Sequence, residues 1–316
     1  MAEPNVGLPD PALLAPLPPS PARHTIFQGP NGLRAGWRVL LFLAIVAAEY
    51  VLLALILRLF LHGNRPAQVS TVGPIGLFLM EASIFLFSSV AALIMARIER
   101  RHYGDYGLPL HSAFSKNFWV GTAAGFLAIS GALFCIFLFH GFRLTGLATH
   151  GSTLVSATLV WTAVFIVVGL SEEFAFRGYL QFTLTTGMGF WPSAFLLSAL
   201  FGLAHAGNPG ESKFGLVSVV FFGLLFCLFL RRTGNLWWAV GFHAGWDWGQ
   251  TFFYGVADSG IPAYHNLFNS EFAGRTWITG GSVGPEASVF TPIVLAAVAI
   301  LFSRVYGQSR QVGKVN

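Results

Sequence analysis

The sequence predicts an all-α, polytopic membrane protein. Of its 316 residues, 54% are hydrophobic and only 10% are charged, whereas soluble domains carry about 25% charged residues. Several apolar runs reach the roughly 20 residues that a helix needs to cross a bilayer. Both cysteines, Cys135 and Cys227, lie inside predicted spans, so they indicate neither a disulfide framework nor a CxxC metal site. We therefore expect one membrane-embedded helix bundle.

About eight spans can be drawn along the chain, and together they define a bundle over residues 34–306. A Pro-rich tail, residues 1–33, precedes the bundle, and a short tail, residues 307–316, follows it. The Pro-rich composition predicts a flexible arm and not a signal peptide. A loop rich in Gly, Ser and Asn, residues 257–284, is the longest connection. The spans are 37–60, 72–96, 118–139, 154–185, 191–206, 214–230, 236–254 and 288–302.

The distribution of Lys and Arg predicts the orientation of the bundle. With both termini in the cytoplasm, thirteen of the eighteen Lys and Arg residues face the cytoplasm, as the positive-inside rule requires. The net charge of +5 then follows from basic loops, and no nucleic-acid partner is expected. This pattern and the short loops favour a bacterial inner membrane. The five Lys and Arg residues that this orientation places outside the cytoplasm are Arg58, Arg65, Arg143, Lys213 and Arg275.

Two adjacent carboxylates and an arginine interrupt the fourth span. Positions four apart on a helix differ by only about 40° and share a face. Glu173 and Arg177 are therefore expected to pair, whereas Glu172 points about 100° away and is left for chemistry. A solvated helix end is the alternative interpretation. Glu81, in the middle of the second span, is either a helper group or a neutral buried carboxylic acid.

Two further spans place polar side chains at the same four-residue spacing. Phe201 and His205 share a face at the end of the fifth span, and His243 and Asp247 share a face in the seventh. Taken alone, His205 is also explained as a histidine at the membrane interface. Taken alone, His243 and Asp247 are also explained as a local hydrogen-bonded pair. An unpaired charge near the bilayer centre costs about 3 kcal/mol on insertion scales, so these groups are expected to meet inside the bundle.

Small residues in the seventh span predict where it packs. Gly241, Gly245 and Gly249 recur every four residues, a stripe that lets another helix approach closely. We expect this close approach to bring His243 within reach of the fourth and fifth spans. The pair formed by Gly121 and Gly125 in the third span is interpreted as packing alone.

The three motifs together resemble those of the CPBP (Abi) intramembrane proteases. That family includes the type II CAAX prenyl proteases and bacteriocin self-immunity proteins. The motifs are Glu172-Glu173-xxx-Arg177, Phe201-xxx-His205 and His243-xxx-Asp247, in order, within a core of about residues 155–255. One position departs from the pattern, because many relatives have Asn where this chain has Asp247.

The resemblance implies hydrolysis of a peptide bond of a membrane-associated protein or peptide, including prenylated CAAX-like ones, by activated water. Glu172 would be the general base, and His205 would hold the same water. His243 and Asp247 would face the carbonyl oxygen, with Glu173 and Arg177 as support. An ionised Asp247 only accepts hydrogen bonds, so either His243 donates while Asp247 orients it, or Asp247 is protonated.

Metal dependence stays open at this stage. We favour no cofactor, with zinc as the alternative, because a carboxylate, two histidines and an aspartate are acceptable zinc ligands. The ligands would then be Glu172, His205, His243 and Asp247. Two other function classes are a proton-coupled transporter and a non-catalytic immunity or scaffold protein. A transporter typically shows inverted repeats and broken helices in both halves, and the sequence shows neither.

Overall fold

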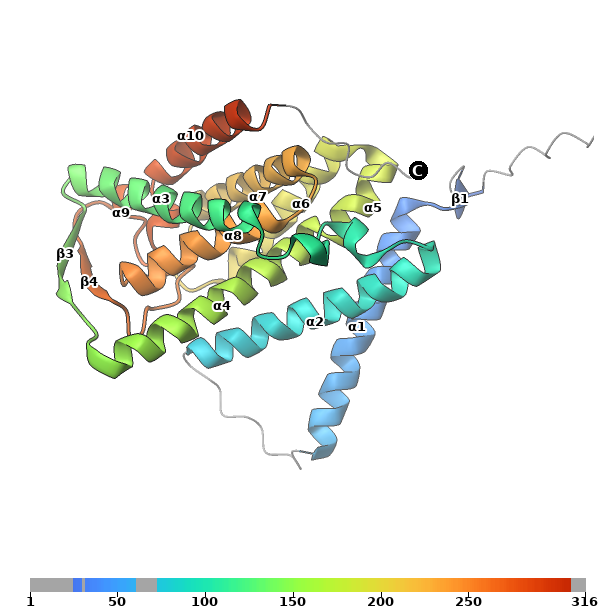
Figure 1. Ribbon diagram of the computed structural model, residues 1–316, viewed down its shortest axis with the longest axis horizontal. Coiled ribbons are helices and arrows are strands. Elements are labelled where there is room, and N and C mark those ends of the chain that lie inside the picture. Colours follow the sequence, from blue (N-terminus) through green and yellow to red (C-terminus); the bar gives the residue numbers. More distant parts are fainter. Residues whose placement is uncertain (1–24, 30–31, 61–72, 308–316) are drawn as a thin grey trace, which may run out of the picture.

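The computed structural model describes residues 25–29, 32–60 and 73–307. Its main elements are long apolar helices (Figure 1). Proline stands at the first position of the second helix, where its missing N–H costs little. The helices are α1 (Ala35–Phe60), α2 (Pro74–Glu99), α3 (Lys116–Leu138), α4 (Gly151–Arg177), α5 (Tyr179–Met188), α6 (Phe190–Ala204), α7 (Lys213–Thr233), α8 (Trp237–Asp247), α9 (Thr276–Thr279) and α10 (Phe290–Val305).

Short elements link these helices. Strand β3 (Phe142–Leu147) pairs antiparallel with β4 (Phe268–Phe272) at one end of the bundle. Strands β1 (Gln28–Gly29) and β2 (Gly32–Leu33) form a second small antiparallel pair ahead of α1. The remaining elements are the 3-10 helices η2 (Tyr103–Tyr106), η3 (Leu110–Ser112), η4 (His205–Gly207) and η6 (Pro285–Ala287), and the π-helix η5 (Trp248–Phe253).

The prediction of a helical membrane bundle is confirmed. Six helical segments of the described chain are long and apolar enough to cross a membrane, the longest comprising α4 and α5 together. The predicted seventh and eighth spans are helical but shorter: α8 has 11 residues before the π-helix, and α10 has 16. The total of eight spans and the cytoplasmic termini therefore stay predictions.

Several predicted boundaries need correction. The fourth span is not one helix, because the chain breaks at Gly178, where a Cβ atom would lie 2.4 Å from the carbonyl oxygen of Phe174. The predicted loop 257–284 contains β4 and α9. The predicted N-terminal tail contains β1 and β2, and its residues 1–24 and 30–31 lie outside the described residues, as do residues 308–316 of the C-terminal tail.

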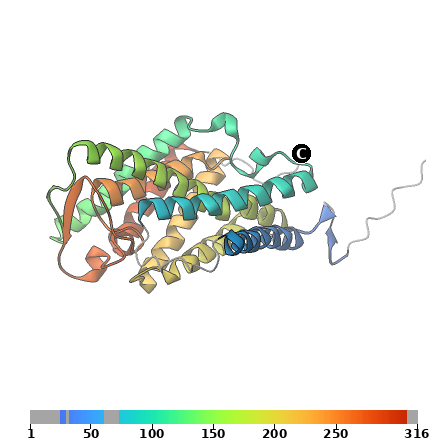
Figure 2. The same ribbon diagram turned by 90° about the horizontal axis from the view of Figure 1, so that it is seen from below.

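Helix α8 is the central element of the bundle. It packs against α3, α4 and α7, and Figures 1 and 2 show it enclosed between its neighbours. Every residue of α8 is buried except His243, which is only partly buried. The outer helices instead expose large apolar side chains, as expected for surfaces that face lipid. A polar side chain on α8 is therefore enclosed by protein.

The predicted glycine stripe does bring α8 close to a neighbour, but that neighbour is α3. A Cβ atom at Gly241 would lie 2.1 Å from the carbonyl oxygen of Phe118, and one at Gly245 would lie 2.1 Å from that of Thr122. From the other side, a Cβ atom at Gly125 would lie 2.0 Å from the carbonyl oxygen of Phe242. The expected approach of His243 to the fourth span is present, with Nδ1 3.1 Å from Oε1 of Glu173, but the glycine stripe does not face that span. His243 reaches α4 from another face of α8.

Candidate active site

The two glutamates of α4 have different surroundings. Glu173 is fully buried, whereas the side chain of Glu172 is 21% exposed and lines an internal cavity. Their separation by about 100° around the helix accounts for this difference. The structure thus places one carboxylate in the protein interior and the other where a substrate or water could reach it.

Arg177 lies next to Glu173, as the spacing predicts. Its Nη1 atom is 3.4 Å from Oε1 of Glu173, and both side chains are fully buried. The guanidinium also lies over the ring of Phe201 on α6, 4.2 Å from the ring centroid. This arrangement combines an ion pair with a cation–π contact and ties α4 to α6.

His243 connects α8 to both glutamates of α4. Its Nδ1 atom is 3.1 Å from Oε1 of Glu173, and its Nε2 atom is 3.6 Å from Oε2 of Glu172. The Nε2 atom is also 3.5 Å from Oδ2 of Asp247, one turn further along α8. The imidazole stacks on Phe226, with 5.1 Å between ring centroids. Glu173, and not only Asp247, therefore orients this ring.

His205 begins η4, directly after α6, and lines the same cavity. Its Nδ1 atom is 2.9 Å from the carbonyl oxygen of Phe201, and its ring packs edge-on against the Phe201 ring. A carbonyl oxygen only accepts, so Nδ1 carries the hydrogen, and in the neutral ring the lone pair is on Nε2. Within the described part of the chain, no direct hydrogen bond or ion pair joins His205 to Glu172.

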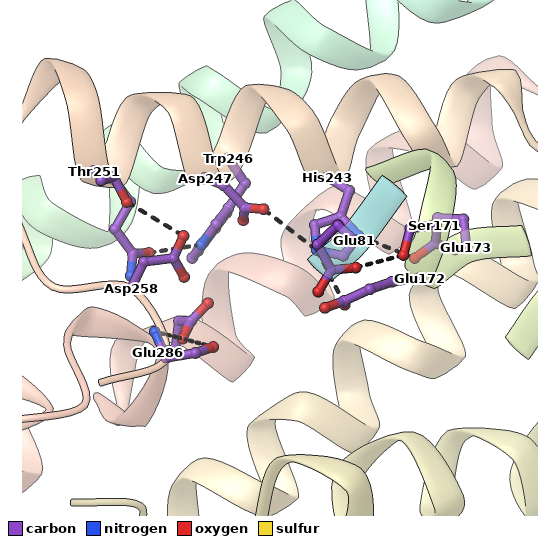
Figure 3. A network of polar contacts seen from close by, with 12 residues as sticks. Glu81, Ser171, Glu172, Glu173, His243, Trp246, Asp247, Thr251, Asp258 and Glu286 are labelled. Atoms are coloured by element: carbon purple, nitrogen blue, oxygen red, sulfur yellow. Dashed lines mark hydrogen bonds and ion pairs between the residues drawn. The ribbon is translucent and has the colours of Figure 1, made fainter. Parts of the chain in front are cut away.

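The cavity has a volume of about 290 Å³. Its walls are mostly apolar and include several large aromatic side chains, which favours a ligand with an apolar portion. Polar groups meet inside it from α2, α4, α8, η4, η6 and the segment after η5. Figure 3 shows those of α2, α4, α8, η6 and the segment after η5. The titratable residues of the lining are Glu81, Glu172, His205, His243, Asp247, Asp258 and Glu286.

Two carboxyl groups that were not anticipated, Asp258 and Glu286, lie beside Asp247. One carboxylate oxygen from each of the three residues lies within 4.8 Å of the others. Asp258 accepts a hydrogen bond from the Thr251 hydroxyl at 3.3 Å, and Glu286 accepts two at 3.0 Å from the backbone and hydroxyl of Ser259. Both lie in segments whose Gly, Ser and Pro content indicates exposed turns, so no local signal marked them as interior groups.

Burial and mutual repulsion raise the pKa of these two loop carboxyl groups. Burial, then the neighbouring Asp247, hold the pKa of Asp258 well above its usual range. Burial, then Asp258, raise the pKa of Glu286 to about 8. Three carboxyl groups this close together do not all ionise at neutral pH, because each added negative charge repels the others. The group around Asp247 therefore holds protons.

The residues suggested as metal ligands are not gathered around one point. Within residues 25–29, 32–60 and 73–307, the one group of three or more potential ligand residues with donor atoms within 4.8 Å of one another is Asp247, Asp258 and Glu286. Glu172 and His243 approach each other to 3.6 Å but lie outside that group, as does His205. Only Asp247 is common to the suggested set and the observed one.

The fold and the site define a class before any comparison. This is an integral membrane protein whose interior holds a cavity lined by several carboxyl groups and by two histidines, His205 and His243. Residues 154–249 match the model of a family described as type II CAAX prenyl endopeptidase Rce1-like. The match confirms the predicted resemblance to the type II CAAX prenyl proteases over that segment, which is about a third of the chain. No curated protein matches the chain.

The matched segment runs from α4 into η5 and contains all three predicted motifs. It includes Glu172, His205, His243 and Asp247. The other cavity carboxyl groups, Glu81, Asp258 and Glu286, lie outside it. Those three groups are contributed by α2 and by the C-terminal part of the chain.

Proposed function

We propose that this protein is an intramembrane endopeptidase that hydrolyses a peptide bond of a membrane-associated protein or peptide. The observation that carries the proposal is the position of His243. Its Nε2 atom lies 3.6 Å from a Glu172 oxygen and 3.5 Å from an Asp247 oxygen, at the wall of an apolar cavity. Glu172 as a base, His243 as a hydrogen-bond donor and the carboxyl group of Asp247 therefore face the same cavity.

Glu172 is the proposed general base. It is the partly exposed member of the glutamate pair, and a carboxylate largely removed from water is an effective base. Glu172 takes a proton from a water molecule whose oxygen attacks the substrate carbonyl carbon. Collapse of the tetrahedral intermediate breaks the C–N bond, and the proton passes to the leaving nitrogen. His205 faces the same cavity and holds the water through the lone pair on Nε2.

His243 is the proposed oxyanion donor. Glu173 accepts from Nδ1, so a protonated imidazole directs its second N–H, at Nε2, into the cavity. Negative charge on the substrate oxygen strengthens that hydrogen bond in the transition state. Asp247 also faces this point, and with a shared proton it acts as a second donor. Arg177 compensates the charge of Glu173 and keeps it in position.

The aromatic walls support a substrate with a lipid-like portion. A prenylated CAAX-like protein is the form of substrate that the family match suggests. An unprenylated transmembrane peptide is the other form. The bilayer that contains the enzyme is proposed to be a bacterial inner membrane, and both substrates approach the site within it.

Cleavage by the purified protein in liposomes tests the proposal. The substrates are a farnesylated CAAX peptide, its unfarnesylated copy and a single-pass transmembrane peptide. We expect Glu172→Gln, His205→Ala and His243→Ala to lower kcat by about 100-fold or more. Glu49→Gln is the matched control, because it removes another carboxyl group from a membrane helix, α1, that is absent from the cavity lining. Folded variants that cleave at the parental rate refute the site.

Zinc dependence is the alternative form of the same proposal. Glu172, His205, His243 and Asp247 would hold the ion, which would supply a Lewis acid. The contacts support the metal-free form better, because these four residues do not converge on one point. Full cleavage by protein freed of metal and treated with a chelator favours water activated by the side chains alone. Loss of cleavage that zinc restores favours the metal.

A further inference from the structure

Phe226 is an aromatic residue of α7 that belongs to none of the three motifs and lies against His243. Its ring is stacked on the imidazole, with 5.1 Å between the ring centroids and 19° between the ring planes. The side chain of Phe226 is almost fully buried, and both residues line the cavity. His243 is therefore in contact with a helix that carries no residue of the proposed catalytic set.

Arg177 contacts the same aromatic ring. The Cζ atom of its guanidinium is 5.5 Å from the centroid of Phe226 and 4.2 Å from that of Phe201. Among the residues that the structure describes, Nε and Nη2 of Arg177 have no hydrogen-bond partner, so the ion pair with Glu173 does not by itself fix the plane of the guanidinium. The aromatic rings fix that plane, because a cation is attracted to a π face.

These contacts form a closed ring of four side chains. Oε1 of Glu173 is 3.1 Å from Nδ1 of His243 and 3.4 Å from Nη1 of Arg177. Phe226 then joins the imidazole of His243 to the guanidinium of Arg177. A hydrogen bond at Nδ1 holds one atom of the imidazole and leaves the ring free to turn about that atom. A flat ring stacked on the imidazole removes this freedom.

We propose that Phe226 is a positioning residue of the peptidase site. It sets the plane of the His243 imidazole, so that Nε2 points into the cavity between Glu172 and Asp247. The role rests on the proposed hydrolysis, because the direction of Nε2 matters to the rate only if Nε2 stabilises the substrate oxygen. Displacement of such a group by about 1 Å can lower a rate by about 100-fold.

Phe226→Leu tests this role, because leucine keeps an apolar side chain at this position but has no flat face. We expect kcat for the farnesylated CAAX peptide to fall by about 10- to 100-fold with KM little changed, since the imidazole acts in the transition state. Phe226→Tyr keeps the aromatic ring and is expected to retain most of kcat. Parental kcat in Phe226→Leu, or an equal loss of kcat in Phe226→Tyr, overturns the role.

Phe229→Leu is the matched control. Phe229 lies on the same helix and is also fully buried, but it is absent from the cavity lining. The two leucine variants remove the same atoms from one core, so we expect similar falls in Tm and a loss of kcat in Phe226→Leu alone. Equal losses of kcat would show that Phe226 only fills space, and would refute the proposal. A raised KM at parental kcat would make Phe226 part of the substrate wall, which refutes it as well.

A spectroscopic readout does not depend on cleavage. Protons that lie over an aromatic face are shifted upfield, so NMR of protein labelled with ¹³C and ¹⁵N at histidine reports the stacking. The His243 ring signals are assigned by their loss in His243→Ala. We expect them to move downfield in Phe226→Leu and to stay in place in Phe229→Leu.

The two readouts separate failure of this inference from failure of the proposed function. Unchanged His243 signals in Phe226→Leu refute the positioning role, whether or not any peptide is cleaved. If the signals move but the parent cleaves none of the substrates, the proposed function fails, while placement of the imidazole by Phe226 stands.

Discussion

His243 has acidic neighbours on both ring nitrogens. Glu173 lies at Nδ1, and Glu172 and Asp247 lie at Nε2. A neutral imidazole satisfies only one side as a donor, whereas an imidazolium donates on both. The arrangement favours the imidazolium, which is the form that stabilises an oxyanion. Arg177 keeps Glu173 compensated at the same time.

Asp247→Asn tests the role of the carboxyl group at residue scale. Asparagine has the same shape and a fixed N–H donor, so we expect a change in kcat/KM of less than about 10-fold, equivalent to about 1.4 kcal/mol. Asp247→Leu removes both donor and acceptor and is expected to cost about 100-fold or more. Cleavage of the farnesylated peptide by the two variants is compared. A loss in Asp247→Asn as large as that in Asp247→Leu shows that an ionised aspartate is required.

Glu286 predicts a pH dependence of stability. Its pKa is about 8 in the folded protein against an ordinary value of 4.5. Between these values the folded state holds a proton that the unfolded chain lacks. The stabilisation is complete below about pH 4.5, decreases as pH rises, and is lost once pH passes about 8.

Thermal unfolding in detergent as a function of pH measures this effect. We expect the parental Tm to fall from pH 5 to pH 8 by more than the Tm of Glu286→Gln, which has no charge to gain. Glutamine still accepts the backbone hydrogen bond from Ser259. Parallel curves for the two proteins would show that Glu286 ionises normally.

At the residue scale, the sequence predicted the contacts between side chains of one helix. It did not predict the contacts that loop residues make with that site. Four-residue spacing predicted that Glu173 lies beside Arg177 and His243 beside Asp247, and both contacts are present. Asp258 and Glu286 reach Asp247 only because the chain after η5 folds back over the cavity. That return depends on tertiary packing, for which a single sequence carries no periodic signal.

Close contact between α3 and α8 positions the site at the element scale. Glycines on both helices allow backbone carbonyl oxygens to lie where side chains would otherwise stand. The sequence identified both glycine sets but not their pairing. The stripe of α8 had no assigned partner, because small residues predict a close approach without identifying the neighbouring helix.

Gly125→Ala tests this contact. The new Cβ atom would lie 2.0 Å from the carbonyl oxygen of Phe242, one residue before His243, so the helices must separate. We expect a loss of about 1–3 kcal/mol in stability and reduced cleavage. Gly131→Ala on the same helix is the control, because nothing lies within 4 Å of its new Cβ atom. Equal Tm values for the two variants would contradict the close packing.

At the scale of the whole molecule, composition was sufficient to predict a helical membrane protein. Apolar run lengths predicted the positions of the long helices to within a few residues. They did not reveal the break at Gly178 or the π-helix after Asp247. Both depend on how α5 and η5 pack against the rest of the bundle. The short, enclosed α8 also shows that an apolar run can be a core helix as well as a span.

The bundle assembles its cavity from segments far apart in the chain. The residues that surround one internal space are Glu81 from α2, Glu172 from α4, His205 after α6 and His243 from α8. The helices between them exclude bulk water and supply aromatic walls. This enclosure is what makes peptide hydrolysis within a membrane chemically reasonable, because only water admitted to the cavity reacts.

Single-turnover cleavage in H₂¹⁸O tests water activation by Glu172 most directly. Excess enzyme in liposomes is mixed with the farnesylated CAAX peptide, and the products are analysed by mass spectrometry. We predict that the new carboxylate of the first turnover contains one ¹⁸O atom, and that Glu172→Gln yields no product on that timescale whereas Glu49→Gln does. An unlabelled first-turnover carboxylate, or parental cleavage by Glu172→Gln, would contradict direct attack by water that Glu172 activates.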